Sequence, residues 1–326
     1  MRALTGIKPS GTPHLGNYLG MIRPAIALQD EGYDCYYFIA SYHALTTMKD
    51  PAKVREYTTK IAATFLALGL DPEKSVFYRQ QDVPEVTELA WVFNCVTNMG
   101  VLLRAHAYRT ACEQVGEDHE GRINAGLFTY PVLMAADILA FESDVVPVGK
   151  DQGQHIAICR DLAQRFNYHF GEDTLKIPEG LTQDNVATVV GTDGRKMGKS
   201  YGNTIDTFLP RKKLRKAIMA IVTDSTPMEA PKDPDNCNVL SLYQAVATPE
   251  QVAALRQRYL AGGMGYGHAK QELFEVLDAL LAEPRDRYNE LMAHPDEILG
   301  TLEEGAAKAR PVARAVTDKV RNAVGL

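Results

Sequence analysis

The first half of the chain alternates short apolar runs with longer segments of helical spacing, and this alternation limits the possible folds more than any other feature. The apolar runs cover residues 4–7, 35–40, 76–78 and 145–148. The helical segments cover residues 18–29, 51–68 and 84–98, and two of them begin at proline, which suits a first helical turn. Strands alternating with helices predict βαβ units and a parallel sheet. We therefore expect an α/β protein with a Rossmann-type sheet, with residues 186–190 as a further candidate strand.

A turn rich in proline and glycine follows the first expected strand. Residues 9–17 read Pro-Ser-Gly-Thr-Pro-His-Leu-Gly-Asn and lead into the first helical segment. Free N–H groups at a helix start favour anions, His14 can donate a hydrogen bond to a phosphate oxygen, and Gly16 permits close approach of a base or backbone. The turn therefore predicts a phosphate site, with a helix entry capped by His14 as the simpler alternative. In a parallel sheet this site lies at the carboxyl ends of the strands, where Pro9, Ser41 and Gly149 are expected to meet.

A second segment carries positive charge on a glycine-rich loop. Lys196 and Lys199 lie in the sequence Lys-Met-Gly-Lys-Ser, between Gly194 and Gly202. Ammonium groups on such a loop can stabilise negative charge that moves toward a departing pyrophosphate, and closure of the loop on the substrate adds selectivity. The two segments together predict a nucleoside triphosphate bound from both ends.

The second half of the chain has a different pattern. Strand signals disappear after residue 207, and helical periodicity continues to residue 324. A chain of 326 residues suits one larger and one smaller domain. We expect a Rossmann-type catalytic domain over residues 1–206 and a C-terminal all-helical domain over residues 207–326. Residues 104–122 read as a helix and loop inserted near the mouth of the site.

Composition limits the class of protein and its partners. With 45% hydrophobic and 23% charged residues the chain is typical of soluble globular proteins. No apolar run approaches the length of a membrane span, and the first residues lack the apolar stretch of a signal peptide. We therefore expect a cytoplasmic protein without a membrane partner. Five scattered cysteines without a CxxC pair predict buried free thiols rather than disulfides or structural zinc.

The formal net charge of −6 does not indicate general affinity for nucleic acid. Any RNA contact must come from local basic patches. The two candidates are residues 211–216 and the basic residues of 308–321. A solvated helix face is the simpler interpretation of both.

These features resemble the class I aminoacyl-tRNA synthetases. Residues 12–17, Thr-Pro-His-Leu-Gly-Asn, stand in the place of the HIGH signature, and residues 196–200 stand in the place of KMSKS. Within the class the chain is most similar to the tryptophanyl enzymes. The matching segments are residues 5–11, 16–20, 125–139, 146–152 and 302–326.

The resemblance implies a tryptophan–tRNA ligase. L-Tryptophan is activated with Mg-ATP to tryptophanyl-adenylate and pyrophosphate, and tryptophan then passes to tRNA(Trp). ATP enters with Mg²⁺ as a substrate complex, and neither a tightly bound cofactor nor a resident metal is implied. The resemblance also implies a homodimer, an insertion around residues 101–142 that contributes to the amino-acid site and the dimer interface, and a helical domain that binds the tRNA anticodon arm.

Site residues follow from the same resemblance. The implied catalytic residues are His14, Asn17, Lys196 and Lys199. The implied ATP-binding residues are Lys8, Ser10, His14, Gly16, Asn17, Gly149, Asp151, Lys196, Met197, Lys199 and Ser200. The implied tryptophan-binding residues are Ile7, His43, Tyr130, Met134, Asp137, Val148 and Gln152. Outside the site we expect Phe77, Tyr78 and Trp91 in the core and His155 as an ordinary helix residue at the pocket edge.

One expected helix indicates the amino acid. Tyr130, Met134 and Asp137 are spaced i, i+4 and i+7, so they share a helical face. Tyrosyl relatives typically carry glutamine where Met134 stands. A methionine suits a flat apolar slot for an indole, and Asp137 can accept the indole N–H. Core packing is the alternative for Met134, but a carboxylate between two apolar neighbours is costly without a partner.

The chain departs from the family pattern at four positions. Gly198 replaces the serine of KMSKS, which we expect to loosen the loop without removing either lysine. Ser41 stands where many relatives are acidic, Lys150 replaces a glutamate, and Ala111 replaces a lysine. Two other functions remain open. One is a nucleotidylyltransferase that joins ATP to a small acid without RNA, and the other is a non-catalytic paralogue that binds tryptophan or a partner protein.

Overall fold

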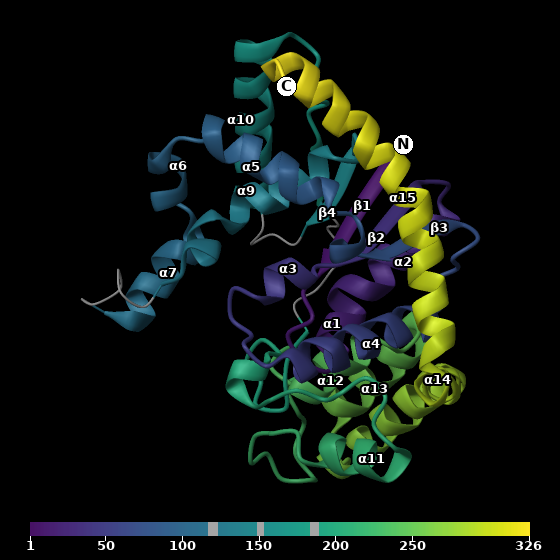
Figure 1. The fold of residues 1–326 in the computed structure, drawn as a ribbon. Coiled ribbons are helices and arrows are strands. Elements are labelled where there is room, and N and C mark those ends of the chain that lie inside the picture. Colours follow the sequence, from purple (N-terminus) through teal and green to yellow (C-terminus); the bar gives the residue numbers. More distant parts are fainter. Residues whose placement is uncertain (117–122, 149–152, 183–188) are drawn as a thin grey trace.

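The computed structural model describes residues 1–116, 123–148, 153–182 and 189–326. In this part of the chain, five parallel strands form one sheet in the order β3-β2-β1-β4-β5 (Figure 1). The strands are β1 (Arg2–Ile7), β2 (Asp34–Ile39), β3 (Ser75–Arg79), β4 (Val145–Val148) and β5 (Glu179–Thr182). The strand order reverses at β1, so the carboxyl ends of β1 and β4 flank the crevice where such sheets bind ligands.

The helices fall into two groups along the sequence. Those of the sheet region are α1 (Leu15–Asn17), the π-helix η1 (Tyr18–Ile22), α2 (Arg23–Asp30), α3 (Ser41–Ala44), α4 (Pro51–Ala67), the 3-10 helix η2 (Gln80–Asp82), α5 (Glu85–Val96), α6 (Met99–Leu103), α7 (His106–Val115), α9 (Ala125–Leu139) and α10 (Gly153–Phe170). The remaining ones are the 3-10 helix η3 (Lys199–Tyr201), α11 (Arg211–Met219), α12 (Asn238–Gln244), α13 (Pro249–Ala261), α14 (Tyr266–Ala293) and α15 (Pro295–Val324). The parallel sheet followed by a helical region confirms the expected fold class.

The four predicted apolar strands are confirmed, whereas the last strand was not predicted. It is β5, Glu179–Thr182, four residues of which only Leu181 is strongly apolar. Of the candidate strand at 186–190, residues 186–188 lie outside the described residues, and Val190 forms a single bridge with Lys196. Pairing with the whole of β4 therefore decides the extended conformation of β5 more than the composition of β5 does.

Both faces of the central strands β1 and β2 are buried, as their largely apolar sequences require. Neighbouring residues of a strand point to opposite faces. Leu4 and Tyr36 join the core that includes residues of α5, α9 and α10. Ala3 and Tyr37 join the core on the other face, which includes residues of α2 and α4. The alternation explains why helices cover both sides.

Two expectations about single residues need correction. Phe77 and Tyr78 are buried as expected, but Trp91 is 71% exposed on α5. Cys35, Cys159 and Cys237 are buried, whereas Cys95 is exposed and Cys112 is intermediate. The outer face of α5 has no covering element in the described chain, so its apolar side chain reaches the surface. Within the described residues no helix is long and apolar enough to span a membrane.

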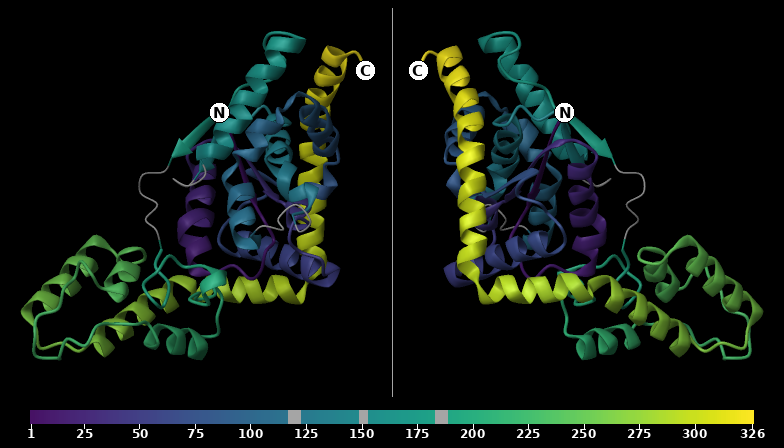
Figure 2. Two further views of the ribbon diagram at one scale, coloured as in Figure 1. Left: turned by 90° about the vertical axis from the view of Figure 1, so that its left-hand side faces the viewer. Right: turned by 90° about the vertical axis from the view of Figure 1, so that its right-hand side faces the viewer.

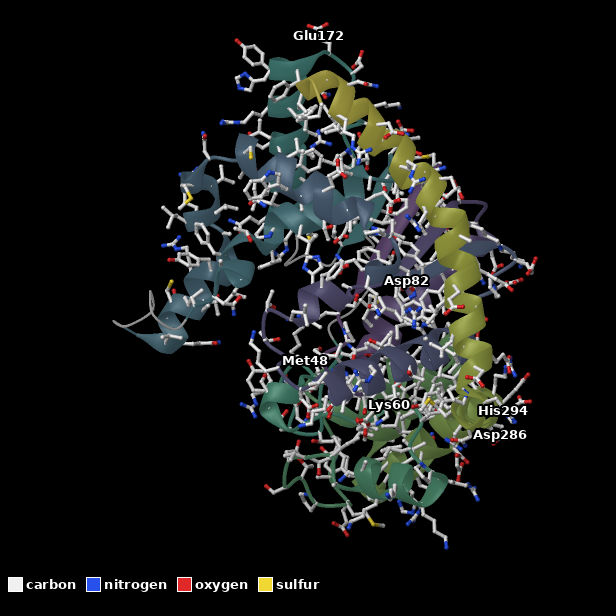
Figure 3. The ribbon with its side chains drawn as sticks, viewed as in Figure 1. Met48, Lys60, Asp82, Glu172, Asp286 and His294 are labelled. Atoms are coloured by element: carbon white, nitrogen blue, oxygen red, sulfur yellow. The ribbon has the colours of Figure 1, made fainter. Side chains whose placement is uncertain are left out.

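The last helix, α15, returns to the sheet. It follows α14 after a sharp corner at His294 (Figure 3) and runs beside the edge strand β3, while α11 to α13 lie at the far end of α14 (Figure 2). Ala306, Ala309, Ala313 and Val316 from α15 are buried in the same core as Tyr36 and Phe38. A helix laid along an edge strand protects its unpaired backbone groups.

The close approach of α15 to β3 depends on Gly305. An ideal Cβ at this position would lie 1.8 Å from the Phe77 carbonyl oxygen, so any side chain must push the helix off the strand. We expect Gly305→Ala to lower the free energy of unfolding by about 3 kcal/mol. Gly300→Ala is the matched control, because nothing lies within 4 Å of its Cβ, and we expect it to stabilise the helix by about 0.5–1 kcal/mol. Urea titrations of both variants measure this, and equal effects would contradict the proposed contact.

Candidate active site

The turn after β1 is organised around His14. Its Nδ1 accepts the backbone N–H of Asn17 at 3.3 Å, and the Asn17 Oδ1 accepts the His14 N–H at 3.1 Å. This reciprocal pair caps α1. Because Nδ1 accepts, the proton of the neutral ring lies on Nε2, which is left to donate. His14 therefore presents a hydrogen-bond donor, as the sequence predicted, while it also caps the helix.

The His14 ring stays neutral at pH values well below those at which a histidine usually takes up a proton. Burial, together with the nearby Lys199 ammonium, lowers its pKa from 6.5 to about 4. We expect the ring resonances of His14 to be constant between pH 8 and about 5.5, which NMR can follow with His14→Asn to assign the signal. The unfolded chain takes up this proton near pH 6.5, so the stability from neutral His14 is complete above that pH and is lost as pH falls toward 4. A midpoint near 6.5 would show that the ring is not buried beside a cation.

The lysine loop is docked on this turn. The N–H of Gly16 points to the Met197 sulfur at 3.2 Å, and an ideal Cβ on Gly16 would lie 2.9 Å from His14 Nδ1 and 3.2 Å from the Met197 Cβ. Met197 is buried in one core with Leu15 and with residues of α11 to α14. Gly16 is therefore required for contact between the two segments, a role the sequence did not indicate. Met197 anchors the loop.

Lys199 reaches the first turn from the loop. An ideal Cβ on Gly11 would lie 2.9 Å from Lys199 Nζ, and Gly11 has a φ of +141° that other residues rarely adopt. Partial desolvation lowers the pKa of Lys199, and the Asp206 carboxylate opposes this shift. Asp206 itself pairs with the His14 backbone in an antiparallel bridge. The structure thus brings together the two predicted phosphate segments.

Asn203 holds the loop in shape and was missed by sequence reasoning. Its Oδ1 accepts the Gly198 N–H at 2.9 Å, and its Nδ2 donates to Asp193 Oδ1 at 2.7 Å and to the Lys196 carbonyl at 3.2 Å. The side chain is 2% exposed. Gly198 has room for a side chain, since the three nearest atoms to its ideal Cβ, two of Tyr201 and the Lys196 carbonyl oxygen, lie at 3.4 to 3.9 Å. The Asn203 side chain thus holds the backbone on both sides of Met197, and a serine would fit at position 198.

The helix α9 carries a buried carboxylate, as predicted. Asp137 is 1% exposed, and its Oδ2 lies 2.8 Å from His43 Nε2. Gln80 Nε2 donates to Oδ1 at 2.7 Å and to Oδ2 at 2.9 Å. Burial raises the pKa of Asp137, while the contacts with His43 and Gln80 oppose this shift. His43 and Asp137 were predicted from the sequence, but Gln80 was not.

Tyr130 lies beside this cluster on the same helix. Its ring meets that of His43 edge-on, with centroids 6.0 Å apart, and its hydroxyl lies 2.6 Å from His155 Nε2. His155, on α10, thus holds Tyr130, a role more specific than the pocket-edge position that we expected. Met134 is partly buried against the core of the sheet.

The carboxyl end of β1 supplies further predicted residues. Ile7 is buried, and Lys8 donates from Nζ to Thr46 Oγ1 at 3.0 Å, which in turn donates to the His43 carbonyl at 2.8 Å. Burial lowers the pKa of Lys8. Lys8 therefore connects the turn after β1 to the segment that carries His43.

The remaining predicted residues divide into two sets. Ser10, Lys196 and Ser200 are exposed, and Val148 is partly buried at the end of β4. Gly149, Asp151 and Gln152, together with Lys150, lie outside the described residues.

The two basic patches differ in their partners. In α15, Arg310 and Arg314 contact Glu85 at 3.1 and 3.3 Å, and Arg321 contacts Glu88 at 2.6 Å. These groups fasten the helix to α5. In α11, Lys212, Lys213 and Lys216 are exposed, and no described residue pairs with them. The arginines of α15 therefore hold this helix against α5. The lysines of α11 are the remaining candidate for an RNA-binding surface.

Comparison with known proteins shows the family of the chain. Residues 1–282 match the family model of tRNA synthetases class I (W and Y). The chain is 51% identical to a tryptophan–tRNA ligase of Pseudomonas putida over 331 residues, which covers 100% of this chain and 74% of the relative. It is 50% identical to that of Xanthomonas campestris, with 100% and 76% covered. The tryptophanyl-tRNA synthetase of Campylobacter jejuni, complexed with ADP and tryptophan, superimposes with a TM-score of 0.90 at 47% identity over 100% of both chains. The chain therefore belongs to the W and Y family of class I tRNA synthetases, and within it to the tryptophan–tRNA ligases.

Proposed function

We propose that this chain activates L-tryptophan with Mg-ATP and transfers it to tRNA(Trp), using the two clusters described above. The observation that carries the proposal is the pairing of a lysine loop docked on the His14 turn with a buried acceptor, Asp137, on the helix of Tyr130 and Met134. The first cluster suits a triphosphate and the second suits an indole. A relative with 47% identity binds ADP and tryptophan, which supports both assignments.

The reaction needs little covalent chemistry from the protein. A carboxylate oxygen of tryptophan attacks the α-phosphorus of ATP in line, and the bond to the β-phosphate breaks to release pyrophosphate. A ribose hydroxyl of the terminal tRNA adenosine then attacks the adenylate carbonyl and releases AMP. Positioning and charge stabilisation account for most of the rate in such phosphoryl transfers.

We assign the phosphates and ribose to the first turn. His14 donates from Nε2 to a phosphate oxygen, Asn17 holds the ribose or phosphates, and Gly16 lies against the adenine. Lys196 and Lys199 stabilise the departing pyrophosphate, with Mg²⁺ entering on the ATP. Lys8, Ser10, Met197 and Ser200 complete the ATP site on the described residues, and Gly149 and Asp151 complete it outside them.

We assign the indole to α9. Asp137 accepts the indole N–H, and Met134 lies against the ring. His43 and Tyr130 border the polar end of the amino acid with Gln152, while Ile7 and Val148 close the slot from the strand ends. Loss of a buried bond of this kind costs a competing substrate about 10⁴-fold.

The helical region from residue 207 is proposed to meet the anticodon arm of the tRNA, chiefly through α11. We expect the triple variant Lys212→Ala, Lys213→Ala, Lys216→Ala to lower kcat/KM for tRNA about 10-fold, with a weaker salt dependence, because each lysine contact releases counterions. Pyrophosphate exchange should be unchanged. Lys74→Ala, an exposed lysine of the sheet region, is the control. Loss of exchange together with charging would mean that α11 supports the fold instead.

Truncation at residue 207 is unsuitable as a test of the helical region, because it also removes α15, whose residues are part of the core of the sheet.

The assembly and location are also proposed. Three apolar side chains on α5 and α6 are exposed: Trp91 at 71%, Met99 at 62% and Leu103 at 48%. Such an apolar surface supports the proposal that a second copy of the chain packs against it. This extends the expected dimer interface beyond residues 101–142. The substrates ATP, tryptophan and tRNA support a cytoplasmic location.

Charging of tRNA tests the proposal. The purified chain should attach labelled tryptophan to tRNA only when Mg-ATP is present. Consumption of ATP without charged tRNA would favour a nucleotidylyltransferase. Tryptophan binding without either reaction would favour a non-catalytic paralogue.

A further inference from the structure

Gln80 is held by both ends of its amide. It lies in η2, directly after β3, and is fully buried at 0% exposure. Its Oε1 accepts the backbone N–H of Tyr42 at 2.9 Å, and its Nε2 contacts both oxygens of Asp137 at 2.7 and 2.9 Å. The reversed amide would face an oxygen to the carboxylate and a nitrogen to the N–H, so only one orientation satisfies all the partners. Gln80 is thus a fixed donor toward Asp137.

The two oxygens of Asp137 are used unequally. Oδ2 accepts from Gln80 and contacts His43 Nε2 at 2.8 Å, whereas within the described residues Oδ1 contacts only Gln80. A carboxylate oxygen can accept two hydrogen bonds. Oδ1 therefore retains capacity for one further donor, while Oδ2 is saturated. The contacts with Gln80 and His43 fix the plane of the carboxylate. They thereby also fix the direction from which a further donor can reach Oδ1.

Ser41 secures the turn that carries Gln80. The N–H of Gln81 lies 3.2 Å from Ser41 Oγ, and Ser41 is 5% exposed at the start of α3. The segments that follow β2 and β3 are thus joined beside α9, which carries Asp137. Ser41, one of the four departures from the family pattern, has a structural explanation here, because its hydroxyl pairs with the neighbouring backbone.

We infer that Gln80 is a positioning residue for substrate specificity, which fixes the Asp137 carboxylate so that Oδ1 accepts the indole N–H of tryptophan. The inference rests on the proposed function and deepens it. Gln80 acts through Asp137 and does not touch the substrate N–H itself. Its loss should therefore affect the recognition of the N–H more than the binding of the ring.

A tryptophan analogue separates these two effects. In benzothienylalanine a sulfur atom replaces the indole N–H, and the size of the ring system is nearly retained. The measurement is kcat/KM for pyrophosphate exchange with tryptophan divided by that with the analogue. We expect Gln80→Met to lower this ratio about 10- to 100-fold, the value of a hydrogen bond to a charged group. Gln81→Met, at an exposed neighbour, should leave the ratio unchanged.

Further variants keep the test decisive. In an Asp137→Asn background, Gln80→Met should change the ratio by less than about 3-fold, because coupled residues are not additive. If Gln80→Met does not fold, Gln80→Glu is measured instead, since it retains an acceptor for Tyr42 and changes the contact with Asp137. An equal loss for both substrates, with the ratio intact, overturns the inference and leaves the proposed function standing. A wild-type chain that activates neither substrate overturns the proposed function itself.

Discussion

Replacing Lys199 with alanine is expected to lower kcat of tryptophan-dependent pyrophosphate exchange by about 10²- to 10³-fold, with a much smaller change in KM for ATP. The Lys199 ammonium lies against the Pro9–Gly11 turn, where an ideal Cβ on Gly11 would be 2.9 Å from Nζ. In the proposed ATP site, a cation there stabilises the negative charge that develops as pyrophosphate leaves. The interaction strengthens in the transition state, so its loss appears in kcat.

Two controls bound this result. Lys74→Ala removes an exposed lysine and should leave exchange unchanged. Lys199→Arg retains the charge with a different shape and should recover part of the rate. A variant that raises KM for ATP and retains kcat would show that Lys199 binds the ground state only, which contradicts the assigned role.

Replacing Asp137 with alanine is expected to lower kcat/KM for tryptophan by about 10²-fold or more and to bring tryptophan and phenylalanine closer together as substrates. The change removes the proposed acceptor for the indole N–H, and His43 and Gln80 lose their contacts with the Asp137 carboxylate. Competition between the two amino acids in pyrophosphate exchange measures the loss of selectivity. Because a buried carboxylate also supports the fold, thermal unfolding of the variant must be measured alongside.

Asp137→Asn separates the two effects. It retains the shape of the side chain, so stability should fall less than in Asp137→Ala, while tryptophan selectivity should still fall because one oxygen is replaced by a donor. Mild and equal effects of Lys199→Ala and Asp137→Ala would show that the site has been misplaced.

The sequence predicts what depends on local pattern. The strands β1 to β4 are apolar runs and were predicted from them, whereas β5 has a single strongly apolar residue and exists because it pairs with β4. The return of α15 to the sheet has a counterpart in the sequence. Ala306, Ala309, Ala313 and Val316 follow helical spacing, and Gly305 beside them marks the close approach to Phe77.

Site residues that act on other residues are harder to predict. Gln80 and Asn203 are polar residues in turns, and nothing in their neighbours shows that they are 0% and 2% exposed. Their burial depends on segments far away in sequence, such as α9 for Gln80. Trp91 shows the opposite error. Its apolar side chain predicts burial, but in the single chain it is exposed to solvent. The family motifs identify the residues that we propose to contact substrate, whereas only the fold shows the residues that hold them in position.

Pyrophosphate exchange into ATP, measured with tryptophan, tyrosine or no amino acid, tests the central claim most directly. The proposed triphosphate site at His14 and Lys199 and the proposed indole site at Asp137 predict rapid exchange with tryptophan and only background exchange with tyrosine or without amino acid. Exchange that tyrosine stimulates and tryptophan does not would contradict the assignment of Asp137 and Met134.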